Sequence, residues 1–298
     1  MSDLTGSPAG RPGIIHDLGY RRFDGVREGT ATIARTLFVT GLRHAYGLGR
    51  SGKSKVMPFL LLAMSLLPAT IVVGVVVLTG LGELPVSYAD YTNQTQLLVS
   101  LFAASQAPVL FSRDLRHGTI ALYLARPLPS AAYAVARWAS LLAATLVFLV
   151  APIVALYVGA VLAELDFSEQ TSEAAEALLL AVLLALMLTG IGGLIASISV
   201  RRGFAVVATI AVLLLGNGVV TAIQGISDEQ DRTRVGEVAG LFSPYSLYRG
   251  ATSALTDEQF LTPPTGGAMT AAYFVVMVAL ALACLGALVV RYRRLAGR

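Results

Sequence analysis

The sequence has few charged residues and few of the residue types that usually carry out chemistry. Only 13% of its 298 residues are Asp, Glu, Lys or Arg, against about 25% in soluble domains. The single cysteine, Cys284, excludes an intrachain disulfide and the Cys-x-x-Cys spacing of metal sites. The three histidines, His16, His44 and His117, are far apart and form no metal-ligand pair. A soluble domain built around a metal centre is therefore not expected.

Apolar residues take the place of the missing charge, since 55% of the chain is hydrophobic and its mean hydropathy is +0.71. A helix needs about 17–25 mostly apolar residues to cross a bilayer. Six runs meet this length: Met57–Gly80, Thr95–Phe111, Trp138–Ala160, Leu178–Ser199, Phe204–Gln224 and Met269–Val290. We therefore predict an all-α membrane protein with six transmembrane helices. Residues 1–56 would form a cytosolic segment, 57–290 the transmembrane domain, and 291–298 a basic cytosolic tail.

The basic residues lie on alternate sides of these six runs. Nineteen of the 22 Lys and Arg residues fall before the first run, between the second and third, between the fourth and fifth, or after the sixth. Short, positively charged loops stay in the cytosol, so both termini are predicted to be cytosolic. The first thirty residues are polar and have no signal-peptide core, so the first run is expected to act as its own insertion signal. No run contains Asp or Glu, which argues against proton-coupled transport.

Two segments outside the runs have the pattern of helices that do not span. Thr30–Tyr46 carries apolar residues at helical spacing, which predicts an amphipathic helix at the inner membrane interface; packing on a neighbouring cytosolic protein is an alternative. Gly225–Thr265 becomes apolar and aromatic after its charged start, and Pro244 suits the first turn of a helix. We expect a short helix there, at the outer interface, before the last span.

The segment Gly47–Ser54 matches the nucleotide-binding pattern GxxxxGKS. That loop requires a strand before it and a helix opening at its Lys-Ser, so that backbone amides can surround phosphate. Here the preceding residues predict a helix instead. We interpret the segment as a flexible basic joint that brings Arg50, Lys53 and Lys55 close to anionic lipid headgroups.

Among the polar residues of the apolar runs, four are singled out: Gln106, Thr189, Asn217 and Gln224. They are candidates for lining a transport pathway. Such residues also serve as hydrogen-bonding groups between helices in a membrane, so both interpretations stay open.

The loop Asp114–Pro127 is the most informative segment of the predicted cytosolic side. Gly118 and Pro127 bracket a short apolar stretch, Thr119–Ala125, which is flanked by arginines. An apolar helix on a cytosolic loop leaves surface that a partner can cover. An interfacial turn packed on lipid is the alternative.

In this loop and in its layout, the chain resembles permease subunits of ABC transporters of the type-2 exporter class, in an actinobacterial-like branch. Those subunits carry an acid-x-x-x-Gly-Thr signature after the second span, followed by a leucine-rich helix and a proline. Asp114, Gly118 and Thr119 occupy the signature positions. The resemblance implies that the loop is a coupling helix that contacts a separate ATP-binding subunit. The implied contact residues are Asp114, Arg116, Gly118, Thr119, Leu122, Leu124 and Arg126.

The resemblance also implies the partners and the location. Two permease chains, identical or different, would join two ATPase subunits in a bacterial cytoplasmic membrane and export a substrate. ATP and magnesium would bind to the ATPase, so no catalytic, cofactor, metal or nucleic-acid site is expected in this chain. The rival hypotheses are a secondary transporter driven by an ion gradient, and a membrane anchor or sensor that transports nothing.

Overall fold

The computed structural model describes residue 25 and residues 28–119, 123, 128–256 and 258–296. Within these residues all regular secondary structure is helical. Five helical segments are long and apolar enough to cross a membrane, and a bent pair of helices makes a sixth if the pair counts as one span. The predicted all-α class is confirmed, with five or six helical segments suited to a membrane.

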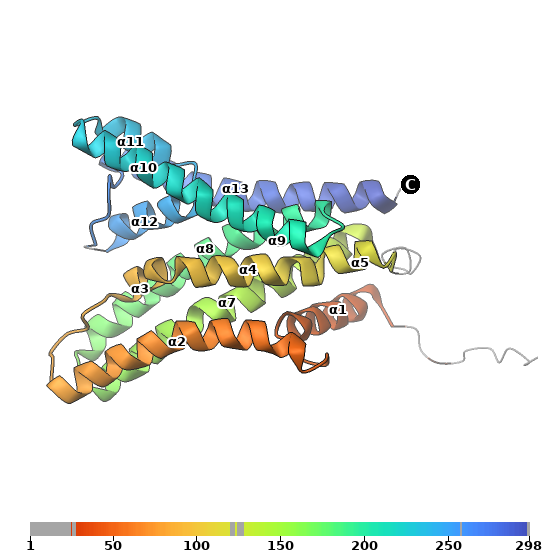
Figure 1. The fold of residues 1–298 in the computed structure, drawn as a ribbon, viewed down its shortest axis with the longest axis horizontal. Coiled ribbons are helices and arrows are strands. Elements are labelled where there is room, and N and C mark those ends of the chain that lie inside the picture. The colour runs from red at the N-terminus through yellow and green to blue at the C-terminus, as the bar shows by residue number, and fades with distance from the viewer. Residues whose placement is uncertain (1–24, 26–27, 120–122, 124–127, 257, 297–298) are drawn as a thin grey trace, which may run out of the picture.

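The helices are, in chain order, α1(Thr30–Ala45), α2(Lys53–Thr79), α3(Tyr88–Gln94), α4(Gln96–Leu110), α5(Ser112–Arg116), α7(Ser130–Leu162), α8(Phe167–Ile198), α9(Arg202–Ile210), the π-helical turn η1(Ala211–Leu215), α10(Gly216–Glu229), α11(Thr233–Gly240), α12(Pro244–Leu255) and α13(Gly266–Ala296). The long helices lie side by side along one axis of the molecule (Figure 1). One end carries α1, α5 and the last turn of α13, and the other carries α3, α11 and α12 (Figure 1).

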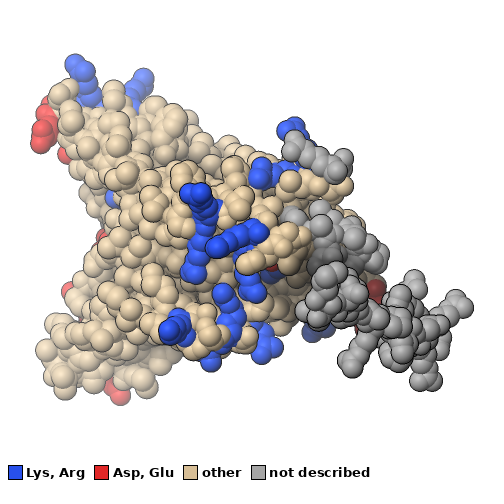
Figure 2. Space-filling view, turned by 45° about the vertical axis from the view of Figure 1, so that its right-hand side comes forward, with Lys and Arg blue, Asp and Glu red and all other residues tan. Residues whose placement is uncertain are grey.

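Charge separates along the same axis. Basic residues concentrate at the α1–α2 joint, in α5, at the α8–α9 junction and at the end of α13. We call this the arginine-rich end. Figure 2 brings this end forward, and Lys and Arg side chains gather on its surface. The opposite end carries most of the described acids, in residues 81–94 and 163–176 and around α10 and α11. Which end faces the cytosol stays a prediction.

Burial differs greatly among the long helices. In α8, 56% of the most apolar window is buried, against 22% in α2 and 22% in Arg202–Glu229. The central helix is therefore α8, while α2 and the α9–α10 segment turn apolar side chains outward. In water this exposure would be costly, but against lipid chains it costs little because there is no water to exclude.

The second span is the one that departs from a straight helix. Its main part, α4, agrees with the predicted run, which began at Thr95. A bend of 63° separates α3 from the continuous segment Gln96–Arg116. The hydroxyl of Tyr91 donates a hydrogen bond to the Ser65 carbonyl on α2, and that of Tyr88 to the Gln170 side chain on α8. These two tyrosines hold α3 across the end of the bundle.

The two predicted helices outside the spans are present. On α1, Leu37, Gly41 and Ala45 are buried, and a Cβ atom at Gly41 would clash with the Ser140 side chain of α7. One face of α1 therefore packs on the bundle. The other expected helix, α12, begins at Pro244 and has its first turn capped by a preceding serine. The sequence had not predicted α3 or α11.

Candidate functional site

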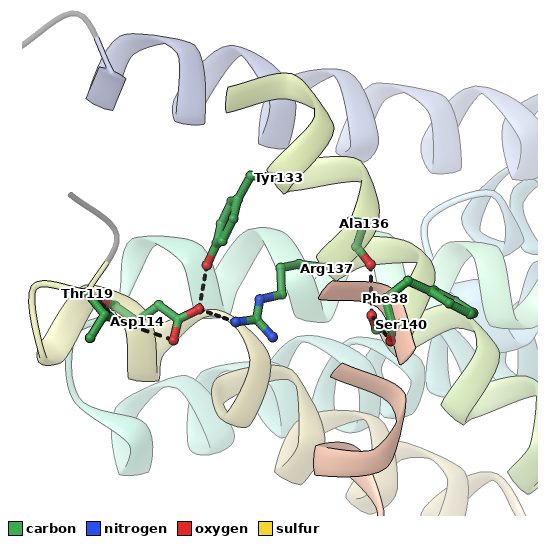
Figure 3. Close-up of polar contacts among 7 residues, drawn as sticks. All are labelled: Phe38, Asp114, Thr119, Tyr133, Ala136, Arg137 and Ser140. Carbon is green, nitrogen blue, oxygen red and sulfur yellow. Dashed lines mark hydrogen bonds and ion pairs between the residues drawn. The ribbon is translucent and has the colours of Figure 1, made fainter. Parts of the chain in front are cut away.

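A buried ion pair lies at the arginine-rich end, directly after α4. The carboxylate Oδ2 of Asp114, on α5, lies 2.5 Å from Nη2 of Arg137 on α7. The same oxygen accepts a hydrogen bond of 2.6 Å from the hydroxyl of Tyr133 (Figure 3). Asp114 is 8% exposed and Arg137 is 5% exposed. No other ion pair is found among the described residues.

Aromatic rings surround the pair. The guanidinium carbon of Arg137 lies 5.6 Å from the ring centroid of Tyr133 and 5.8 Å from that of Tyr123, close enough for cation–π attraction. On its other side, Tyr133 lies 5.2 Å from the ring of Tyr292 on α13. The cluster therefore joins α5, α7 and α13. Because removing one partner leaves a buried charge uncompensated, breaking such a pair costs about 3–5 kcal/mol.

The acid-x-x-x-Gly-Thr spacing has a physical explanation in the loop. Gly118 adopts a φ of +65°, a left-handed conformation that glycine adopts without a steric penalty, and so the chain turns back after α5. The hydroxyl of Thr119 then donates to the Asp114 carbonyl at 3.3 Å and reaches the carboxylate at 3.5 Å. The acid fixes the loop to α7, the glycine reverses the chain, and the threonine closes the turn.

The structure places the other expected contact residues unevenly. Arg116 and Gly118 are exposed, and Thr119 is half-buried. Leu122, Leu124 and Arg126 lie outside the described residues. Asp114 faces the interior, where its carboxylate binds Tyr133 and Arg137 of α7 and so positions the loop. Its contact with a partner stays a prediction.

Two residues of this cluster, Arg137 and Tyr133, were not identified as functional from the sequence. Arg137 was counted only as a positive charge that orients the chain, and Tyr133 was not singled out. One signal was available, because Arg137 directly precedes the apolar run that begins at Trp138.

The four residues proposed to line a transport pathway have different surroundings. Gln106 borders a pocket of about 230 Å³ at the arginine-rich end. The Thr189 hydroxyl donates to the Ala185 carbonyl of its own helix. The other two lie in a buried network at the opposite end of the bundle, where Asn217 Oδ1 accepts from Ser243 at 3.0 Å and Gln224 Nε2 donates to a serine of α12 at 3.0 Å. In this conformation Asn217 and Gln224 tie α10 to the start of α12.

The GxxxxGKS segment joins two helices. It follows α1, and Lys53 is the first residue of α2. Gly47 and Gly49 have φ values of +68° and +77°, and a Cβ atom at Gly47 would meet the Ser54 backbone. The glycines thus close a tight turn between α1 and α2. The described part of the chain contains no strand, so the geometry of a nucleotide-binding loop is not met there.

These features define a class: the chain is a multi-pass helical membrane protein. It has a buried ion pair at one end and, at the other, a hydrogen-bonded network in which neutral groups predominate but in which the Arg249 guanidinium and the Glu237 carboxylate also take part. No group of three or more His, Cys, Asp or Glu residues is placed to hold a metal ion in the described parts of the chain. Comparison with protein-family models and with curated protein sequences gives no match for this chain.

Proposed function

We propose that this protein is the membrane-spanning permease subunit of an ABC exporter, driven by ATP that a separate subunit hydrolyses. In this proposal the arginine-rich end faces the cytosol of a bacterium, as the distribution of basic residues favours. The loop that begins at Asp114 contacts the ATP-binding subunit. Two permease chains form the complete transporter.

The observation that carries this proposal is the anchoring of the signature loop. Its acid, Asp114, is bound to Tyr133 and Arg137 in the first turns of α7, a helix of 33 residues that runs the length of the bundle. The start of the loop, α5, directly follows α4 in the chain. A force on the exposed residues Arg116 and Gly118 would therefore reach α4 and α7 together.

This arrangement fits a transporter driven by a partner protein. Coupling requires an element with two arrangements whose equilibrium the partner can shift. A loop joined rigidly to two spans transmits such a shift better than a mobile loop, because little of the motion is lost in the connection. The charged cluster also contacts α13 through Tyr292, so a third span would respond.

Purification of the tagged full-length chain from its own membranes, in mild detergent, tests the proposal. Mass spectrometry of the co-purified proteins is expected to find a soluble protein in stoichiometric amount with both a GxxxxGKS loop and an LSGGQ signature. The variant Arg116→Glu, in the exposed part of the loop, should lose that protein. The matched variant Arg234→Glu, on α11 at the opposite end, should retain it.

Two results would overturn the proposal. Recovery of the chain without any ATPase, across several detergents, would favour a gradient-driven transporter or an anchor. Equal loss of the ATPase in Arg116→Glu and Arg234→Glu would show that the loop does not determine the contact. Transport assays distinguish the two rivals, since flux that survives ATP depletion and fails on gradient collapse belongs to a secondary transporter.

A further inference from the structure

Two adjoining pockets at the arginine-rich end are lined by cations from three separate parts of the chain. The first, of about 180 Å³, is bordered by Arg50, Arg113, Arg116 and Arg202, with His117 at its edge. The second, of about 230 Å³, is also bordered by Arg50 and Arg202. Lys53, Met57 and Gln106 complete its wall. The two pockets share Arg50, Val109 and Arg202, so they form one cationic hollow.

The cations of this hollow have no acidic partner in the described structure. The ion pair found there uses Arg137 and Asp114. The Asp114 carboxylate points toward Tyr133 and Arg137 of α7 (Figure 3). Arg50, Arg113 and Arg202 also donate no side-chain hydrogen bond to another described residue. Partial burial, followed by repulsion from Arg113 and Arg202, lowers the pKa of Arg50. The mutual repulsion would be relieved by an anion.

The folding of the chain makes this meeting of charges specific. The tight glycine turn between α1 and α2 presents Arg50 and Lys53, α5 presents Arg113 and Arg116, and the first turn of α9 presents Arg202. Positive charge in a loop can set the orientation of the chain in the membrane wherever the loop lies on the cytosolic side. Orientation alone therefore does not explain why three connecting segments bring their cations to one hollow.

Apolar surface adjoins the hollow on two sides. Met57, which lines the hollow, is 41% exposed, and Leu60 on the next turn of α2 is 53% exposed. On the other side, Val200, which lines the first pocket just before α9, is 54% exposed. A free anion would use the cations alone. A lipid would place its headgroup among the cations and its acyl chains against Val200 and along α2.

We propose that this hollow binds the phosphate group of an anionic lipid, with Arg50 and Arg202 as its central ligands. Arginine suits this role, since its planar guanidinium makes paired hydrogen bonds to phosphate oxygens. The site does not require the transport function proposed above, because a lipid can bind to the isolated chain. The GxxxxGKS segment would thus bind phosphate through its basic side chains, by a geometry unrelated to that of a nucleotide-binding loop.

Lipid titration of the purified full-length chain in non-ionic detergent tests the site, with native mass spectrometry to count bound lipids. Phosphatidylglycerol and phosphatidylcholine with identical eight-carbon chains provide the comparison. We expect phosphatidylglycerol to bind at least about tenfold more tightly, because one basic residue near an anionic headgroup contributes about fivefold in affinity. Arg50→Gln and Arg202→Gln should each weaken binding about fivefold.

Matched variants distinguish a pocket from general surface charge. Arg201→Gln removes the same charge one residue away, at a side chain that does not line the hollow, and should weaken binding clearly less than Arg202→Gln does. Arg202→Lys keeps the charge and should retain most of the affinity. Thermal unfolding of each variant shows whether it is folded, and Arg202→Gln, at an exposed position, is expected to be.

Three results would overturn the inference. Equal binding of the two lipids would show that the site does not require an anionic headgroup. Equal losses of affinity in Arg201→Gln and Arg202→Gln would show that general surface charge, and not the hollow, binds the lipid. Displacement of phosphatidylglycerol by inorganic phosphate or pyrophosphate at similar concentration would assign the hollow to a free phosphate compound instead of a lipid.

Discussion

The two ends of the bundle are held together by different chemistry. At the end opposite the arginine-rich end, most hydrogen-bonding groups are neutral. The Tyr245 hydroxyl bonds to Ser100 Oγ at 2.6 Å, and the Tyr248 hydroxyl donates to the Ala89 carbonyl at 2.9 Å. The hydroxyl of Tyr273 donates to the Glu237 carbonyl at 2.8 Å. At the arginine-rich end, the main link between α5 and α7 is the pair of Asp114 and Arg137.

This difference in chemistry predicts different responses of the two ends to the loss of one contact. Many neutral hydrogen bonds, each worth about 0.6 kcal/mol between membrane helices, fix one end without strong dependence on any one of them. A buried charge pair concentrates the energy in a single contact, and its loss leaves an unpaired charge. An end built this way responds as a unit when a partner moves one of its members, which is the behaviour a coupling loop needs.

Removal of the ion pair between Asp114 and Arg137 is expected to have the largest effect on stability. In Arg137→Gln the buried Asp114 carboxylate keeps only neutral partners, so the free energy of unfolding should fall by about 3–5 kcal/mol. Reversible unfolding in mixed detergent and SDS micelles measures this change. Arg116→Gln, at an exposed position, should change stability by less than about 0.5 kcal/mol. Equal losses in the two variants would show that the pair does not fix α5 to α7.

The turn that follows the pair is the next most sensitive point. Gly118→Ala places a side chain at a φ of +65°, which costs about 1–2 kcal/mol and should reduce recovery of the ATPase in co-purification. Gly286→Ala, on α13, is the control: a Cβ atom there meets nothing within 4 Å, and alanine favours a helix. Recovery that is unaffected in Gly118→Ala would mean that the reversed turn is not needed for the contact.

A neutral group at the opposite end should matter less. Tyr245→Phe removes the hydroxyl that contacts Ser100 and the Gln96 carbonyl, and we expect a loss of about 0.6–1.7 kcal/mol in unfolding free energy. Co-purification of the ATPase should not change. A loss as large as that of Arg137→Gln would remove the distinction between the two ends.

The smallest expected effect is a pH dependence at the arginine-rich end. Burial, followed by repulsion from Arg113, Arg137 and Arg50, lowers the pKa of His44 below 6.5, and Asp114 opposes this only in part. The unfolded chain therefore takes up a proton at a higher pH than the folded chain does. His44 contributes stability above about pH 6.5 that is lost as the pH falls through its lower folded pKa.

Unfolding measured at pH 7.5 and 5.5 tests this sign. The loss of stability on acidification should be smaller in His44→Gln than in the unchanged protein. His117→Gln, at an exposed position of the same end, should lose as much stability as the unchanged protein. An equal or larger loss in His44→Gln would contradict the depressed pKa.

The sequence was sufficient for the features that depend on local pattern. Hydropathy located the long helices, the spacing of Leu37 and its neighbours located α1, and Pro244 located the start of α12. By contrast, α3 is short, and its tyrosines are buried through bonds to residues 26 and 82 positions away. Such an element is fixed by packing and has no periodic signal of its own.

The candidate site divides in the same way. Asp114, Gly118 and Thr119 belong to one short motif, and they were found from it. Tyr133 and Arg137 lie 19 and 23 residues from Asp114, and their pairing depends on how α5 packs against α7. The cationic hollow combines three segments of the chain, so only the folded structure brings Arg50 and Arg202 together.

Crosslinking from the two ends tests the central claim most directly. A photoreactive amino acid would replace His117, which is exposed beside the signature turn, or Phe242, which is 79% exposed between α11 and α12. In intact cells, position 117 is predicted to form a crosslink to a soluble ATPase, and position 242 to form none. A crosslink to the ATPase from position 242, or none from position 117, would contradict the assignment of the arginine-rich end as the surface that receives the ATP-binding subunit.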